Sequence, residues 1–169
     1  MAVHTKILIF SDSHGNTRNL SRAIAEHGDS VDLILHLGDG IADLPPEAGA
    51  MCQTVRGNFE DCFSRYMDVK TELLLPVAGK TIYACHGHRH GVKTFEAMFA
   101  RYAAERGADI ALFGHTHMPY LRYAPEEEYG RPLYLFNPGS IGSPRGGKAS
   151  YGILEISEGG VLLSHRYFS

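Results

Sequence analysis

The stretch Lys-Ile-Leu-Ile-Phe-Ser-Asp-Ser-His, residues 6–14, decides how this chain folds. An apolar run rich in β-forming residues stops abruptly at polar ones, which is typical of a buried strand followed by a loop. Asn16 and Thr17 then supply N-cap residues for a helix that Gly28 ends. Apolar runs at residues 31–37 and 51–55 continue the alternation. Strand–helix–strand order with buried strands predicts parallel pairing and right-handed crossovers.

The middle of the chain adds a hairpin and one more helix. Residues 72–76 and 80–85 are two β-rich runs that predict a β-hairpin. Thr94 is the expected cap of a helix that ends at Gly107, and residues 110–113 predict another buried strand.

Beyond Pro119 we expect strands and no helix, with the Glu126-Glu127-Glu128 run as a solvated turn. The expected strands cover residues 121–123, 133–136, 151–156 and 161–165. The predicted fold is α/β: two stacked mixed β-sheets flanked by helices, a four-layer αββα sandwich. We expect residues 1–169 to form a single domain.

Composition narrows the classes of function. The net charge of −3 speaks against a basic face for bulk nucleic-acid binding. No apolar stretch approaches the ~20 residues that span a bilayer, and the amino terminus lacks the pattern of a signal peptide, so we expect no membrane association. Cys52, Cys62 and Cys85 show no C-x-x-C pairing, which favours a reduced, cytoplasmic protein.

Five segments that follow apolar runs end in residues that bind divalent metals. They are Asp12-Ser13-His14, Gly38-Asp39, Gly57-Asn58, His86 and His115-Thr116-His117. Sites in an open α/β sheet form beyond the carboxyl ends of the strands, so these segments can converge. Their carboxylate, amide and imidazole groups suit Mn, Fe, Zn, Ni or Co, with Mn the first choice. Two Asp, one Asn and four His predict a site for two metal ions.

Two ions roughly 3.5–4 Å apart would lower the pKa of a bridging water, clamp substrate oxygens and offset charge at phosphorus. Asp39 is our choice for the bridging ligand, because the two oxygens of one carboxylate can bind separate ions.

The order Asp-x-His, Gly-Asp, Gly-Asn, His-Gly and Gly-His-Thr-His resembles the calcineurin-like metallophosphoesterase superfamily. The short length and the Asn137-Pro138-Gly139-Ser140 segment are similar to its small single-domain phosphodiesterase branch in bacteria and archaea. The resemblance covers the chain from about Ile7 to the carboxyl end. It implies a phosphodiesterase acting on a phosphate-ester small molecule, in which a hydroxide activated by two metal ions attacks phosphorus in line.

The resemblance also implies a role for each matching residue. The first ion would be held by Asp12, His14, Asp39 and His117, and the second by Asp39, Asn58, His86 and His115. Asp39 would thereby be catalytic, and Asn58 would also contact substrate.

One position departs from the family pattern. Many members carry Gly-Asn-His-Asp/Glu, in which the His protonates the leaving group, whereas this chain has Gly57-Asn58-Phe59-Glu60. The small-phosphodiesterase branch also tends to lack this His. Phe59 cannot transfer a proton, so His88, two residues after His86, is a candidate for the catalytic acid. Arg145 is a candidate for binding the substrate phosphate through its guanidinium, although a solvated loop arginine is slightly favoured.

The remaining features have ordinary explanations. His90 reads as a solvated loop residue, and Asn137 is as compatible with a turn as with support of the site. Phe95, Met98, Phe99 and Tyr102 form a stripe expected to be core, whose outer edge is a candidate surface for homo-oligomerisation. The other histidines read as structural or surface residues: His4, His27, His36 and His165.

Two other functions stay open. The same fold serves as a protein-interaction scaffold in the eukaryotic retromer subunit, which resembles this branch but has lost part of the ligand set. A metal-binding scaffold with little or no catalysis is therefore the alternative, although every ligand position is filled here. A metal-dependent hydrolase of another ester is the third hypothesis.

Overall fold

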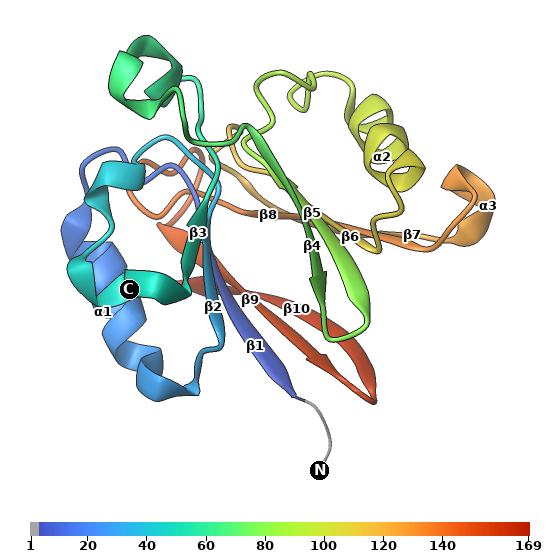
Figure 1. Cartoon of the computed structure of the whole chain (residues 1–169), viewed down its shortest axis with the longest axis horizontal. Coiled ribbons are helices and arrows are strands. Elements are labelled where there is room, and N and C mark those ends of the chain that lie inside the picture. Colours follow the sequence, from blue (N-terminus) through green and yellow to red (C-terminus); the bar gives the residue numbers. More distant parts are fainter. Residues whose placement is uncertain (1–3) are drawn as a thin grey trace.

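The computed structural model describes residues 4–169, in which ten strands form two mixed five-stranded sheets (Figure 1). The strands are β1 Thr5–Phe10, β2 Leu33–His36, β3 Cys52–Thr54, β4 Glu72–Val77, β5 Lys80–Cys85, β6 Ile110–Leu112, β7 Pro119–Ala124, β8 Leu133–Pro138, β9 Ser150–Ser157 and β10 Gly160–Tyr167. The first sheet has the order β10-β9-β1-β2-β3, and the second has the order β4-β5-β6-β8-β7.

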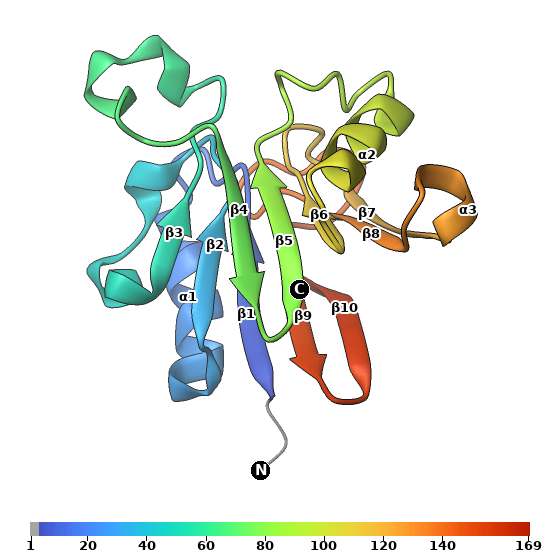
Figure 2. The same cartoon turned by 45° about the vertical axis from the view of Figure 1, so that its right-hand side comes forward.

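Each sheet contains three adjacent parallel strands. In the first sheet β1 pairs with β2 and β2 with β3 in parallel, and β9 and β10 are antiparallel additions. In the second sheet β5, β6 and β8 are parallel, and β4 and β7 are antiparallel at the two edges. The carboxyl ends of the parallel strands therefore share one edge in each sheet, as predicted. Figure 2 shows the arrowheads of β2, β3 and β5 pointing toward the same end of the molecule.

Three apolar clusters separate four layers, which confirms the predicted sandwich. The central cluster lies between the sheets and includes Ile9, Leu112 and Leu154. A second cluster packs the second sheet against α2, Glu96–Glu105. The third packs the first sheet against α1, Thr17–His27. Asn16 caps α1 by accepting the N–H of Asn19, and Gly28 ends it, as the sequence predicts.

The helix α2 differs from the prediction in its start and its buried face. Phe95, and not Thr94, occupies the N-cap position, and no side chain of the described residues caps this end. Phe95 and Met98 are 60% and 67% exposed, so the predicted core stripe is wrong for both. The buried face instead consists of Phe99, Ala100, Ala103 and Ala104. The small alanines of this face let the helix pack closely against the sheet. Met98 lies outside this face and is exposed.

A short helix beyond Pro119 was not expected. Residues Glu126–Tyr129 form α3, a single turn that Gly130 ends with φ of 78°. The exposed acidic side chains of this turn agree with the solvated segment that was predicted. Among residues 4–169, no helix combines the length and the apolar composition that crossing a membrane requires.

Candidate metal centre

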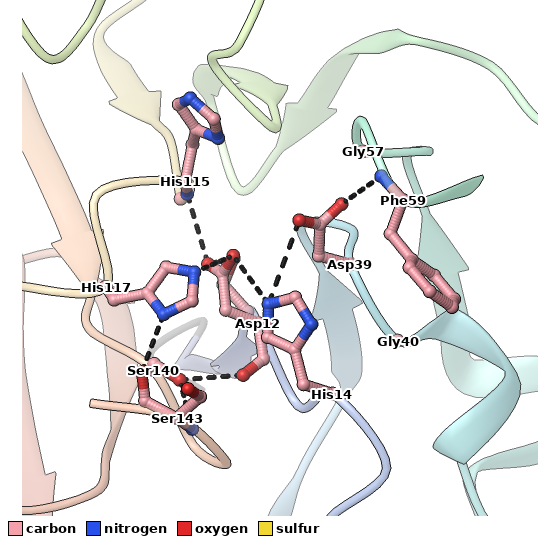
Figure 3. A network of polar contacts seen from close by, with 12 residues as sticks. Asp12, His14, Asp39, Gly40, Gly57, Phe59, His115, His117, Ser140 and Ser143 are labelled. Atoms are coloured by element: carbon pink, nitrogen blue, oxygen red, sulfur yellow. Dashed lines mark hydrogen bonds and ion pairs between the residues drawn. The ribbon is translucent and has the colours of Figure 1, made fainter. Parts of the chain in front are cut away.

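The predicted ligand side chains meet where the carboxyl ends of the parallel strands of the two sheets lie side by side. Figure 3 shows Asp12 and Asp39 of the first sheet beside His115 and His117 of the second. Two hydrogen bonds join the loops of the two sheets here: the side-chain Oδ2 of Asp12 accepts the N–H of His115 at 3.1 Å, and Ile141 N–H donates to Ser11 O at 3.1 Å. Segments that lie more than one hundred residues apart are therefore held together by hydrogen bonds to backbone N–H groups.

Asp12 lies at the middle of this cluster and is fully buried. Its Oδ2 accepts the Ser11 hydroxyl at 2.5 Å as well as the His115 N–H. Its Oδ1 accepts no hydrogen bond from the described residues, although buried polar atoms nearly always have a partner. Around this oxygen lie three imidazole nitrogens, at 3.1 Å for His117 Nε2, 3.7 Å for His14 Nε2 and 3.9 Å for His86 Nε2.

The tautomers of two histidines sharpen this observation. His86 Nδ1 lies 2.7 Å from Leu37 O, and a carbonyl oxygen only accepts, so Nδ1 carries the proton. In neutral His86 a lone pair on Nε2 then faces Asn58 Oδ1 at 3.2 Å and Asp39 Oδ2 at 3.4 Å. His117 is held in the same way, because its Nδ1 lies 2.6 Å from Ser143 O. Lone pairs facing oxygens repel one another unless a cation lies between them, so the donor set fits a metal.

The side chains form two compact sets, and within each set the ligand atoms lie within 4.8 Å of one another. One set is Asp12 with His14 and His117, and the other is Asp12 with Asp39 and His86. Asp12 belongs to both sets. Asp39 Oδ2 is 3.8 Å from His14 Nε2 and 3.4 Å from His86 Nε2, so this carboxylate also lies between the two groups. His115 is outside both sets that the described residues form, but its ring centre is 5.1 Å from that of His86.

Charge is distributed unevenly in the cluster. Burial opposes ionisation of Asp12, but the adjacent imidazoles of His117, His14 and His86 hold its pKa far below the usual range. Burial likewise opposes the charged form of His86, yet the adjacent Asp39 and Asp12 carboxylates raise its pKa. Burial and the nearby His86 lower the pKa of His115 to about 4. Anionic carboxylates and a neutral imidazole are the forms that bind a divalent ion.

Five of the predicted ligands have left-handed backbone conformations. These are Asp12, His14, Asp39, His115 and His117, with φ of 55°, 42°, 58°, 67° and 61°. Within residues 4–169 the one other non-glycine residue with positive φ is Ala78, in the β4–β5 turn. Such conformations are costly for side chains with a Cβ, and they concentrate at functional sites.

Glu60 supports the centre, although the sequence prediction gave it no role. Its buried carboxylate accepts the backbone N–H groups of Asp39 at 2.8 Å, Gly40 at 2.7 Å, Ile41 at 3.2 Å and Gly57 at 2.7 Å. It therefore joins the loop after β2 to the loop after β3. An acidic residue directly after Gly57-Asn58-Phe59 was the available signal, since its family counterpart is also acidic.

Two glycines allow a close approach between the loops of the cluster. A Cβ on Gly57 would lie 2.1 Å from Asp39 Oδ1, and one on Gly114 would lie 2.0 Å from Ser11 Oγ. Neither position has room for a side chain, so both loops require glycine there.

Asn137 and Ser140 brace the loops from below. Asn137 is fully buried, and its Nδ2 donates to Gly114 O at 2.9 Å while its Oδ1 accepts the Gly139 N–H. Asn137 therefore stabilises the turn at Gly139 and also supports the loop that carries His115 and His117. Ser140 Oγ donates to Asp12 O at 2.7 Å.

The two candidate residues for substrate and proton transfer lie beside the cluster. His88 Nε2 is 2.9 Å from Asp61 Oδ2, and the His88 ring centre is 5.4 Å from that of His86. Its buried Nδ1 has no hydrogen-bond partner within the described chain. The Arg145 side chain is exposed, and its backbone N–H donates to His117 O at 3.1 Å.

The prediction for His90 is wrong. Its ring packs against Tyr102, with 4.8 Å between ring centres, and its Nε2 lies 3.1 Å from the Tyr83 hydroxyl. The aromatic residues on α2 and β5 draw it inward. His36 is structural as expected, because its buried ring contacts Ser13 Oγ and accepts the Gly38 N–H.

Known proteins share this architecture. A predicted phosphoesterase from Streptococcus pneumoniae superposes with a TM-score of 0.75 at 24% identity, covering 97% of this chain and 99% of that one. Vps29 of Entamoeba histolytica, solved in complex with Zn²⁺, gives a TM-score of 0.68 at 18% identity and covers 98% and 100%. At these identities the likeness concerns the fold.

Sequence relatives go further than the fold. The probable metallophosphoesterase YsnB of Bacillus subtilis is 38% identical over 152 residues, which cover 89% of this chain and 83% of YsnB. The phosphodiesterase YfcE of Escherichia coli is 33% identical over 75 residues, or 44% of this chain and 34% of YfcE. The profile of the calcineurin-like phosphoesterase superfamily domain matches residues 5–159. Because this profile covers most of the chain and YsnB is similar over most of its length, the chain belongs to the calcineurin-like phosphoesterase superfamily.

Proposed function

We propose that this chain is a phosphodiesterase that depends on two divalent metal ions. The observation that carries the proposal is the buried Asp12 Oδ1, which lacks a hydrogen bond from residues 4–169 and faces three imidazole nitrogens. The partial similarity to a relative named phosphodiesterase supports the diester preference. We further propose Mn as the first ion to test and a phosphate-ester small molecule as the substrate.

The two ions divide the ligands according to the loops. Asp12, His14, Asp39 and His117 would hold one ion, and Asp39, Asn58, His86 and His115 would hold the other. The proximity of Asp12, His14 and His117, and that of Asp39 and His86, supports this division. Asp12 lies close enough to His86 to touch the second group as well. When bound, the ions activate water near neutral pH and offset the charge on the phosphate.

Groups around the ligands complete the reaction. Asp61 accepts a hydrogen bond from His88 Nε2, which fixes the ring, so the proton that His88 would transfer is the one that Nδ1 carries in the imidazolium form. Asn58 and the exposed Arg145 guanidinium would bind the phosphate oxygens. The hydrogen bond from Arg145 N–H to His117 O holds the Arg145 backbone beside the ligand loop. Phe59 leaves the usual acid position without a proton donor.

The scaffold hypothesis is the second candidate, supported by the Vps29 structures of the same fold. It predicts metal binding and little turnover, whereas the phosphodiesterase hypothesis predicts both. The two differ in one measurable quantity, the rate of ester hydrolysis by protein with a full complement of metal.

The test combines metal analysis with an assay. Protein reconstituted with Mn should bind about two ions per chain by elemental analysis and hydrolyse bis(p-nitrophenyl) phosphate faster than p-nitrophenyl phosphate. Asp39→Ala should lose both metal and activity, whereas Asp29→Ala, an exposed aspartate remote from the ligands, should lose neither. Full metal content without turnover with Mn, Fe, Zn, Ni or Co would favour the scaffold.

A further inference from the structure

Three aromatic rings form a row beside the metal centre, which we name the aromatic ridge: Phe59, Phe63 and Tyr66. Ring centres are 5.3 Å apart between Phe59 and Phe63 and 6.3 Å apart between Phe63 and Tyr66. Phe59 is 46% exposed and Phe63 is 38% exposed. A single exposed phenylalanine needs no explanation, but contiguous exposed rings mark a contact surface.

The aromatic ridge begins at the metal centre itself. The Phe59 N–H donates to Asp39 Oδ1 at 2.8 Å, and the Phe59 ring meets the His14 ring edge-on with 6.4 Å between ring centres. Figure 3 shows the ring flanking Asp39 and His14. A phosphate held by these ligands would therefore have Phe59 as a neighbour for one of its ester groups.

The backbone holds the ridge in place before any ligand arrives. Phe59 and Phe63 occupy the N-cap positions of two consecutive 3-10 turns, Glu60–Cys62 and Ser64–Tyr66, and Tyr66 ends the second turn. Cys62 N–H donates to Phe59 O at 3.2 Å, and Phe63 N–H donates to Glu60 O at 3.0 Å. The buried Glu60 carboxylate fixes the same segment to the loop after β2. Rings positioned in this way lose little conformational entropy when they bind a ligand.

The chemistry of the ridge selects flat groups. Aromatic faces stack on aryl rings and on nucleobases of any sequence, since every base presents a π-face. The Arg65 guanidinium lies over Phe63 and Tyr66, with 5.1 Å and 4.8 Å from its carbon to the ring centres. This cation leaves Phe59, next to the ligands, as the ring whose exposed surface is available for stacking.

We propose that the aromatic ridge binds the ester group that remains on the phosphate after hydrolysis, where that group carries an aryl ring or a nucleobase, while the phosphate lies at the metal centre. The inference rests on the proposed phosphodiesterase function and specifies its substrate class. It also gives Phe59 a positive role at the position where the family acid is missing.

Three esters with one leaving group test this inference: the methyl, benzyl and thymidine-5′ esters of p-nitrophenyl phosphate. Because p-nitrophenolate leaves without a proton donor, the comparison is independent of His88. Wild-type kcat/KM should be about tenfold higher for the benzyl or thymidine ester than for the methyl ester, as expected for one stacking contact. Preference for thymidine over benzyl would identify a nucleobase, and the reverse would identify an aryl group.

Phe59→Leu and Phe63→Leu keep apolar bulk and remove a ring. Phe59→Leu should reduce the ratio of aromatic to methyl kcat/KM severalfold, mainly through KM, and Phe63→Leu, which removes the ring packed against Phe59, should reduce it less. Circular dichroism and metal content check the folding of both variants. Phe95→Leu, an equally exposed phenylalanine on α2, should leave the ratio unchanged. Equal rates for all three esters would overturn the inference and keep the phosphodiesterase. No hydrolysis of any ester would overturn both, and a change of oligomeric state with an unchanged ratio would identify the ridge as a protein contact instead.

Discussion

The two sheets contribute different chemistry to the metal centre. The first sheet supplies both carboxylates, Asp12 and Asp39, together with His14 and Asn58, whereas the second supplies only imidazoles. The imidazoles also depend on the first sheet for their orientation, since His86 donates to Leu37 O and the His115 N–H donates to Asp12. Both negatively charged ligands thus follow strands of the first sheet. Neither sheet alone forms a site, so the packing between the sheets is itself a condition of metal binding.

The largest effect should follow from neutralising Asp12, the carboxylate that is common to the two compact groups of ligand atoms, Asp12 with His14 and His117 and Asp12 with Asp39 and His86. Asp12→Asn should reduce activity and metal affinity by more than the roughly 10–100-fold that loss of a supporting residue costs. The metal-dependent rise in melting temperature should vanish with it. His115→Ala, on the second sheet and outside both sets, should retain more metal by elemental analysis. Equal loss in the two variants would contradict the unequal division between the sheets.

The next effect concerns the proton donor, which involves His88 after β5 of the second sheet and Asp61 after β3 of the first. His88→Ala should slow hydrolysis of a diester with a poor alkyl leaving group about 100-fold, the lower range for general acid catalysis, and spare p-nitrophenyl esters. Asp61→Asn should show the same dependence on the leaving group in weaker form, because it positions His88. Full activity of His88→Ala on alkyl esters would exclude His88 as the acid.

A smaller effect should come from the support on the first-sheet side. Glu60→Gln replaces an oxygen that accepts backbone N–H groups with an NH₂ group that repels them. Leaving such buried groups unsatisfied should cost about 1–3 kcal/mol of unfolding free energy in urea. Activity should fall roughly 10–100-fold through displacement of Asp39. Glu47→Gln, at an exposed acidic residue, is the matched control.

The smallest effect concerns His36, the buried histidine of the first sheet. Burial lowers its pKa to about 4, so the folded protein keeps it neutral while the unfolded chain binds a proton below about pH 6.5. Its contribution to stability is therefore complete above pH 6.5 and is lost as the pH falls toward 4. Between pH 7 and pH 5 the loss amounts to roughly 2 kcal/mol. In metal-free protein, His36→Asn should show a loss smaller by that amount in urea titrations; an equal loss would place the titration elsewhere.

The sequence predicted the features that depend on local pattern. Apolar runs identified the strands, and the polar residues after Phe10 and Leu37 identified the edge where ligands gather. It did not predict Glu60 as a cage for four N–H groups, because that role arises from two loops brought together by parallel pairing of β2 with β3. His90 and Met98 were misjudged for a related reason. Which side of a loop or helix is buried depends on the size of the partners across the interface, here Tyr102 and the alanines of α2.

The left-handed backbones of the ligand residues have an evolutionary consequence. Each of the five is held in a conformation that glycine adopts freely, at a cost on the order of 1 kcal/mol or more. Replacing such a ligand with glycine relieves that strain while it removes a metal contact. A lineage released from selection for hydrolysis would therefore gain stability as it lost ligands, so drift toward a metal-poor descendant is thermodynamically downhill. The strain at all five positions is therefore a stability cost that this chain carries for the site.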